Sequence, residues 1–270
     1  MRVFLLMIFA MTAWAQASAT SEQQPHYQPG WPCTGKERSF DPTYSKIAEA
    51  TGGHLFLLDK SEVAGTSALV TGDMQHKDTL VRASGKLESY IDIPIPVDAS
   101  VDSLFVVASL QCMQTILLYD PQRSGVNGAP DQDHWFRAGR TAIILKPVAG
   151  EWLLRLAGTG AYSVAVQAHA TLGMHSLQLD GSTEKTVVLQ LSPQVANPQF
   201  RLVSPTGQPV QTLALEPDPN SPGRFRGTFQ PPAAQFRVQV EDGAGFQRVD
   251  PRLFEAKPYE ARPGEPKPVQ

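Results

Sequence analysis

The chain has 270 residues, 41% of them hydrophobic, and its 23 basic and 26 acidic residues give a net charge of -3. This length and composition are enough for one large or two modest folded domains, and the mixed charges indicate neither a nucleic-acid-binding nor a polybasic membrane surface. At the N-terminus, Arg2 precedes an apolar run, 3–13, and small residues follow up to Ala19. This is the pattern of a cleaved secretory signal, and the run is about half of the ~20 residues that a membrane-spanning helix needs. We therefore expect residues 1–19 to be removed and the mature chain to be periplasmic or secreted, with no membrane span.

Residues 20–65 are expected to form a lead-in that carries one short helix. Up to residue 40 the segment is rich in Pro and Gly and shows no periodicity. Asp41 then offers a helix cap, Pro42 fits the first helical position and Gly52 follows, so we predict a helix over Pro42–Ala50. The apolar run His54–Leu58 predicts a short buried strand.

The chain has two cysteines, Cys33 and Cys112. Because both lie in the exported part, where the compartment is oxidising, we predict that they form a disulfide. Two inert free thiols are the alternative. A reactive or metal-binding thiol would need a neighbouring His or second Cys at ligand spacing, and the sequence has neither.

Between residues 66 and 170 apolar and polar residues alternate, and turn residues separate short β-type runs. No long amphipathic helix interrupts the series, which disfavours parallel β–α–β units and favours an antiparallel β-sandwich or jelly roll. The predicted strands of this domain are Thr79–Ala83, Glu88–Ile95, Ser103–Leu110, Gln114–Tyr119, Thr141–Lys146, Trp152–Leu156 and Tyr162–Ala168.

A second β-rich series covers residues 171–254, with a domain boundary expected near Thr171. Its size and its number of strands are typical of an Ig-like β-sandwich. The proline-rich tail, 255–270, lacks apolar periodicity and is predicted to be disordered. The predicted strands of the second domain are Ser176–Leu179, Thr186–Leu191, Gln199–Val203, Val210–Leu215, Arg224–Phe229 and Gln235–Glu241.

The sequence contains none of the short motifs that carry common catalytic chemistry, such as a nucleophile elbow, a zinc-protease helix or a phosphate-binding glycine loop. Its six histidines are scattered without metal-ligand spacing. The small residues of Gly158–Gly160 lie between two predicted strands and indicate a tight hairpin turn. We therefore expect a non-catalytic protein without a cofactor.

One segment combines several residue types that could bind a ligand: Asp131, Asp133, His134 and Trp135, expected in a loop. Two carboxylates at positions i and i+2 could share a calcium ion, although an ordinary solvated loop fits the pattern better. Trp135 could stack on a sugar or bury its ring at the edge of a sandwich. More broadly, the loops within 124–137 and 220–224 are the expected contact surfaces, because loops of β-sandwiches often carry binding residues.

A further group, Arg224, Arg226 and Arg237, recurs at alternate or near-alternate strand positions. Such a pattern is typical of the solvated face of a strand, and it could also meet an acidic glycan.

Three stretches, in this order, resemble the segment that follows the von Willebrand factor A domain in hemicentins and related A-domain-containing proteins. The resemblance implies a galactose-binding-like β-sandwich followed by an Ig-like domain, preceded by the closing helix and strand of an A domain. The stretches are Tyr44–Lys60 (YSKIAEATGGHLFLLDK); Ile116–Pro121 (ILLYDP) with Ile143–Trp152 (IILKPVAGEW) and Gly160–Val166 (GAYSVAV); and Phe200–Gly207 (FRLVSPTG) with Gln235–Val240 (QFRVQV) and Gly245–Arg248 (GFQR).

The chain departs from this family at one important place. The family's A domain binds a divalent cation through an Asp-x-Ser-x-Ser loop, and too few residues precede Tyr44 to hold that loop, so the resemblance implies no metal role. A fold name also does not show that this protein binds galactose. We expect an exported binding, adhesion or scaffold protein that meets a protein or glycan of the cell envelope or extracellular matrix. The alternative is an accessory domain or subunit of a secreted hydrolase.

Overall fold

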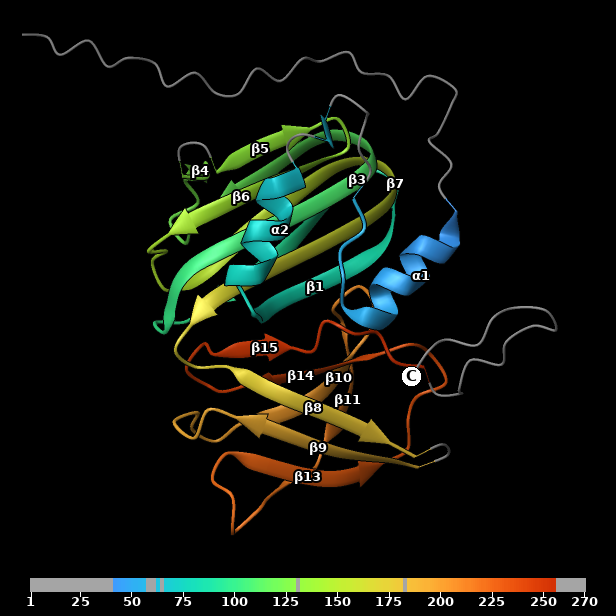
Figure 1. Ribbon diagram of the computed structural model, residues 1–270, viewed down its shortest axis with the longest axis vertical. Coiled ribbons are helices and arrows are strands. Elements are labelled where there is room, and N and C mark those ends of the chain that lie inside the picture. Colours follow the sequence, from blue (N-terminus) through green and yellow to red (C-terminus); the bar gives the residue numbers. More distant parts are fainter. Residues whose placement is uncertain (1–40, 57–61, 64–65, 130–131, 182–183, 256–270) are drawn as a thin grey trace, which may run out of the picture. The chain divides into compact units, whose positions relative to one another are not determined.

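The computed structural model describes residues 41–56, 62–63, 66–129, 132–181 and 184–255 (Figure 1). These residues form a mainly β protein in which all paired strands are antiparallel. The predicted signal, Cys33 and the predicted tail beyond Glu255 lie outside the described residues. The mainly β fold class predicted from the sequence is therefore confirmed.

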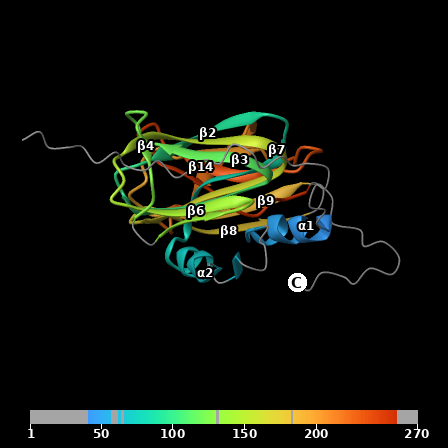
Figure 2. The same cartoon turned by 90° about the horizontal axis from the view of Figure 1, so that it is seen from above.

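The first sandwich is one seven-stranded sheet that folds over on itself. Its two longest strands, β3 and β7, pair with each other along nearly their whole lengths. The second half of β7 pairs with β1 and the first half with β2, so the sheet closes over a core lined by Leu104, Ile116 and Val164. Figure 2 shows the resulting layers, with β2 and β4 in one and β6 in the other. The strands are β1 (Asp78–Leu87), β2 (Tyr90–Val97), β3 (Val101–Tyr119), β4 (Gly125–Val126), β5 (Asp133–Phe136), β6 (Gly139–Leu145) and β7 (Gly150–Ala170).

The fold-over happens where β3 and β7 bend together. Gly158 and Gly160 have φ angles of 143° and 95°, which side-chain-bearing residues rarely adopt. A Cβ atom on Gly158 would lie 2.1 Å from the carbonyl oxygen of Cys112 on β3. The prediction of a hairpin turn at Gly158–Gly160 is thus wrong. The glycines let a single 21-residue strand bend between the two layers.

The second sandwich consists of two four-stranded sheets, ordered β11-β10-β14-β15 and β12-β13-β9-β8. Its separate core includes Leu189, Phe200, Phe236 and Val238, all at most 4% exposed. The described strands up to β7 pair within the first sandwich, and those from β8 onward pair within the second. The change from one sandwich to the other therefore lies at residues 171–173, between β7 and β8. The strands are β8 (Met174–Asp180), β9 (Lys185–Leu191), β10 (Gln199–Val203), β11 (Pro209–Leu213), β12 (Glu216–Pro217), β13 (Arg224–Phe229), β14 (Arg237–Glu241) and β15 (Gln247–Val249).

The described part of the chain has two helices, α1 (Pro42–Thr51) and α2 (Thr66–Gln75). The prediction of α1 is confirmed: Asp41 caps it by accepting a hydrogen bond from the Thr43 N–H at 2.9 Å, and Gly52 ends it at a φ of 75°. Helix α2 was not predicted.

The region between the two helices also differs from the prediction. Residues 53–56 form no strand, so the strand predicted from His54 is wrong for these residues, and its end lies outside the described ranges. Phe56 instead packs with Leu69 of α2 against Phe105, Val107 and Ile143 on the outer face of the first sandwich.

Candidate functional site

The structure places the described residues of the predicted ligand-binding segment on an edge strand rather than in a loop. Asp133, His134 and Trp135 belong to β5, and Asp131 lies outside the described residues. The carboxylate of Asp133 accepts hydrogen bonds from Arg140 Nε at 2.9 Å, from Arg140 Nη2 at 2.6 Å and from the Gly128 N–H at 2.7 Å. Since Arg140 is only 2% exposed, Asp133 acts as the counterion of a buried guanidinium.

These contacts change how the segment is interpreted. A carboxylate that already accepts three hydrogen bonds is a poor calcium ligand, and the described residues contain no group of three or more His, Cys, Asp or Glu placed to hold a metal. Trp135 keeps 38% of its surface exposed, and the Arg140 guanidinium lies 4.6 Å from its ring centroid. Trp135 therefore remains available for a contact, whereas Asp133 is structural.

The three strand arginines have different positions. Arg224 and Arg226 are exposed, as predicted, but Arg237 is fully buried and its predicted place on a solvated face is wrong. Its guanidinium donates to the Pro205 carbonyl at 3.0 Å and forms an ion pair with Glu49 of α1. A buried arginine that is paired and hydrogen-bonded is compatible with the core, since both its charge and its N–H groups have partners.

Glu49 also approaches a buried arginine of the first sandwich. Its carboxylate lies 3.7 Å from Arg82 on β1, and Arg82 in turn donates to the Gly53 carbonyl and to His54 Nδ1, at 3.0 Å. Burial and the Arg82 charge lower the pKa of His54, which keeps the ring neutral so that Nδ1 can accept. One glutamate of α1 thus faces guanidinium groups from both sandwiches. We call Glu49, Arg82, Arg237 and His54 the α1 ion cluster.

Another buried arginine, Arg248 of β15, makes comparable hydrogen bonds from the second sandwich to residues that follow strands of the first. It donates to Asp98 Oδ2 at 2.7 Å and to the Leu172 carbonyl at 2.7 Å, and its Nη2 lies 3.3 Å from the Ser100 hydroxyl. These partners follow β2 or the end of β7. The residues that join the sandwiches are therefore held by charge-assisted hydrogen bonds.

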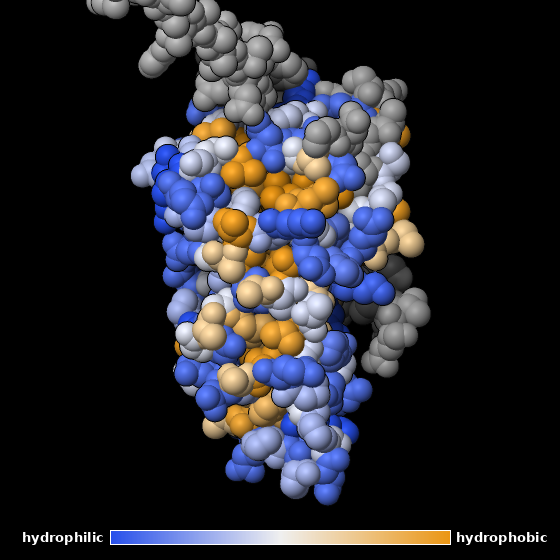
Figure 3. Space-filling model, turned by 90° about the vertical axis from the view of Figure 1, so that its left-hand side faces the viewer, coloured by the Kyte–Doolittle hydropathy of each residue, from blue (hydrophilic) through white to orange (hydrophobic). Residues whose placement is uncertain are grey.

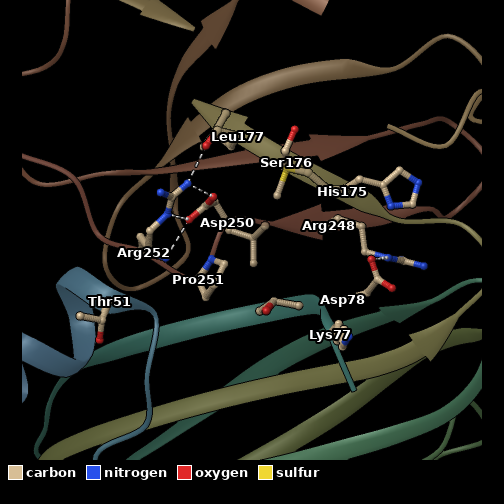
Figure 4. A pocket seen from close by; sticks show the side chains of 13 residues that line it. Thr51, Lys77, Asp78, His175, Ser176, Leu177, Arg248, Asp250, Pro251 and Arg252 are labelled. Carbon is tan, nitrogen blue, oxygen red and sulfur yellow. Dashed lines mark hydrogen bonds and ion pairs between the residues drawn. The ribbon is translucent and has the colours of Figure 1, made fainter. Parts of the chain in front are cut away.

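Between the two sandwiches lies a hollow of about 360 Å³, which we call the junction cleft (Figure 4). The start of β1 supplies Asp78 on one side, β8 supplies His175 and Ser176, and β15 with the residues after it supplies Arg248 and Arg252. These side chains come from segments far apart in the sequence. The cleft is lined by Thr51, Lys77, Asp78, Thr79, Met174, His175, Ser176, Leu177, Arg248, Val249, Asp250, Pro251 and Arg252.

Charges in the junction cleft are mixed and partly neutralised. Arg252 binds Asp250 through two hydrogen bonds, at 2.9 and 2.7 Å. Burial raises the pKa of Asp78, although the nearby Arg248 charge and the Met174 N–H oppose that shift. His175 Nε2 lies 3.1 Å from the Ser192 hydroxyl, which accepts the Gly173 N–H at 2.9 Å. The side chains that line the cleft can therefore both donate hydrogen bonds to a polar ligand and accept hydrogen bonds from it.

A third feature is the layer formed by α1, residues 53–56 and α2, which we call the helical layer. Both helices lie on the same side of the molecule in Figure 2. Several of their exposed side chains are large and apolar: Ile47 is 54% exposed, Val70 60% and Met74 70%. Tyr44 of α1 and Val63, just before α2, are exposed as well. Exposed apolar groups gathered in one region indicate an interaction surface.

Apolar side chains also gather along the middle of the face shown in Figure 3, with polar side chains on both sides of them. They lie over both sandwiches. The described exposed apolar residues outside the helical layer include Leu145, Val148 and Val210.

Sequence reasoning missed the junction cleft and the helical layer for different reasons. The cleft depends on residues from β1, β8 and β15 that no local pattern links. The helical layer could have been found in part, because Val70 and Met74 are four residues apart, the spacing of one helix face. The apolar pattern of α2 is weak, because Leu69 is the large apolar side chain with which the helix packs on the sheet. The closest approach of α2 to the sheet is made by Gly72, which has no side chain. A Cβ atom there would lie 2.4 Å from the Phe105 ring.

Comparison with known proteins gives no family for this chain. No protein-family model matches it, and neither does any curated protein sequence. Among solved structures, a lipase of Bacillus licheniformis, BlEst2, in its propeptide form has a TM-score of 0.32 at 13% identity, over 64% of this chain and 40% of that one. The β-glucuronidase 3 of Bacteroides uniformis in its apo form has a TM-score of 0.23 at 9% identity, over 68% of this chain and 28% of that one. A β-1,2-glucanase of Parabacteroides distasonis has a TM-score of 0.21 at 9% identity, covering 69% and 38%.

This chain thus spans well under half of the length of these structures. Within the described residues, neither helix is long and apolar enough to cross a membrane.

Proposed function

We propose that the chain is an exported, non-catalytic binding or scaffold protein that docks a partner protein of the envelope or extracellular matrix on its helical layer. The observation that carries this proposal is the exposure of Tyr44, Ile47, Val63, Val70 and Met74. These residues belong to α1, to α2 or to the residues just before α2, and both helices lie on the same side of the molecule (Figure 2). Water-exposed apolar area of this kind is unfavourable in a free protein and becomes favourable when a partner covers it.

The buried ion pairs support the scaffold part of the proposal. Glu49 and Asp98 bind arginines of the second sandwich, so both sandwiches and α1 share polar contacts that exclude water. A surface carried by such a framework loses little conformational freedom when it binds, which favours affinity. The proposed partner contributes an apolar surface, because few charges lie among the exposed residues of the helical layer.

Site-specific photo-crosslinking tests this proposal. A photoreactive amino acid is placed at Val70, at Met74 or, as a matched control, at Val210, an exposed valine of the second sandwich. We expect the same discrete adduct from positions 70 and 74 in an envelope or secreted extract, and none from position 210. Purified partner should then lose binding to Met74→Asp but not to Val210→Asp. Equal adducts at all three positions would refute the helical layer as the docking surface.

The identity of the adduct distinguishes the two expected functions. An adhesion or matrix protein supports the scaffold proposal. A secreted hydrolase that binds stably at the helical layer would instead favour an accessory subunit.

A further inference from the structure

We propose that the junction cleft binds a small, neutral, polyhydroxylated ligand through Asp78 and Arg248. This site shares Thr51, the last residue of α1, with the helical layer but none of its exposed apolar side chains, and it does not depend on a protein partner. It rests on a buried N–H group that forms no hydrogen bond within the described residues, a nearby carboxylate and the size and charge of the cleft.

The N–H group without a hydrogen bond to the described part of the chain is Nε of Arg248. The residue is fully buried, and its two terminal nitrogens have partners, Asp98 and Leu172 among them. Among the residues that the structure describes, Nε has no hydrogen-bond partner. Arg248 lines the cleft, and a buried N–H without an acceptor is unfavourable. A ligand group that reaches Nε from the cleft and accepts its hydrogen bond would therefore gain more than it would in water.

Asp78 supplies the complementary acceptor. Its Oδ1 lies 3.9 Å from Arg248 Nε, too far for a direct hydrogen bond. An oxygen placed about 2.8 Å from each atom can bridge them with ordinary hydrogen-bond lengths. A hydroxyl group suits this position because it accepts from Nε–H and donates to the carboxylate at the same time.

The other charges of the cleft favour a neutral ligand. Asp250 is neutralised by Arg252, and Arg248 is paired with Asp98. Lys77 and Asp78 then leave one charge of each sign. An anionic ligand would meet the Asp78 carboxylate, and a cationic ligand would meet Lys77 and Arg248, so neither sign of charge is favoured.

Size and lining indicate the ligand class more closely. About 360 Å³ lies at the small end of the range for ligand sites, roughly 300–1,000 Å³, and suits one or two sugar-sized rings. Thr51 and Ser176 add hydroxyl groups at the cleft. Met174, Leu177 and Pro251 add apolar surface for the carbon-bearing face of such a ring.

The test uses the purified full chain and a panel of glucose, galactose, mannose, maltose and cellobiose, with glucuronate and glucosamine as charged counterparts. Binding is measured by ligand-observed NMR and by calorimetric titration at millimolar concentrations. We expect at least one neutral sugar to bind saturably and more tightly than its charged counterparts. Asp78→Asn should weaken binding about tenfold, since the amide keeps the shape but loses the charge-assisted hydrogen bond.

A blocking variant keeps the test valid if Asp78→Asn disturbs folding. Ser176→Trp places a bulky ring on the exposed side of β8 at the cleft and should abolish binding. Thr212→Trp, at an exposed position of β11, is its matched control and should bind normally. The proposal is overturned if no neutral sugar binds, if charged sugars bind better, or if Ser176→Trp binds as well as Thr212→Trp.

Discussion

Replacing Glu49 by Gln tests whether the α1 ion cluster holds the protein together. The substitution keeps the size of a side chain that is 11% exposed, and it leaves Arg82 and Arg237, at 2% and 0% exposure, without their carboxylate. Breaking a buried ion pair by removing one partner costs about 3–5 kcal/mol of unfolding free energy. Both arginines keep carbonyl partners, so we take the lower value, about 3 kcal/mol. At about 2–4 °C per kcal/mol for a chain of this size, the melting temperature should fall by roughly 6–12 °C.

Differential scanning calorimetry and urea unfolding measure this effect. Lys46→Gln, at an exposed position of the same helix, is the matched control and should change stability by less than about 0.5 kcal/mol. In a double-mutant cycle, Arg237→Gln should cost less in the Glu49→Gln background than in the wild type, because the pair is already broken. If Glu49→Gln melts within the error of Lys46→Gln, the cluster contributes no net stability and the reasoning is refuted.

Three further predictions concern the bend in β7, the histidine of the α1 ion cluster and the cysteines. Gly158→Ala should lower the unfolding free energy by more than about 2 kcal/mol, because its Cβ would meet the Cys112 carbonyl. Gly243→Ala is the control and should change stability little, because no atom lies within 4 Å of a Cβ at that position. Equal urea midpoints for the two variants would contradict this prediction. Because the pKa of His54 is lowered in the fold, the unfolded chain takes up its proton first. Stability should therefore be full above about pH 6.5 and decrease as the pH falls below that value, and His54→Gln should reduce the slope of melting temperature against pH. Peptide mapping of the non-reduced exported protein should link Cys33 to Cys112, and alkylation of both without reduction would exclude the disulfide.

Much of the strand layout could be predicted from the sequence because strand patterns are local. The runs Thr186–Leu191 and Arg224–Phe229 lie at or within one residue of β9 and β13. The helix α1 was equally predictable, since its cap and its terminating glycine adjoin it. The errors arose where a local pattern has two structural solutions. Gly158–Gly160 is suited both to a turn and to a bend within a long strand, and only the pairing of β7 with β3 selects the bend.

The candidate sites could be predicted far less well. Asp133 was chosen for its neighbours in sequence, but its partner is Arg140 across the β5–β6 pair, which makes it a structural counterion. Arg237 occupies a strand position that suggests exposure. Its burial becomes favourable because Glu49 of α1 packs beside it and forms an ion pair with its guanidinium.

By itself, the sequence determined an alternating, antiparallel β protein with a capped helix ahead of the strands, because periodicity and caps act over a few neighbouring residues. The tertiary structure alone decided which charges are buried and where a cleft opens. The bond from Arg237 to Glu49 joins residues 188 positions apart, and the bond from Arg248 to Asp98 spans 150. Such contacts form only when whole sheets pack together. The stability that a charge pair contributes depends on how deeply it is buried, and this burial is not determined by the sequence around either residue.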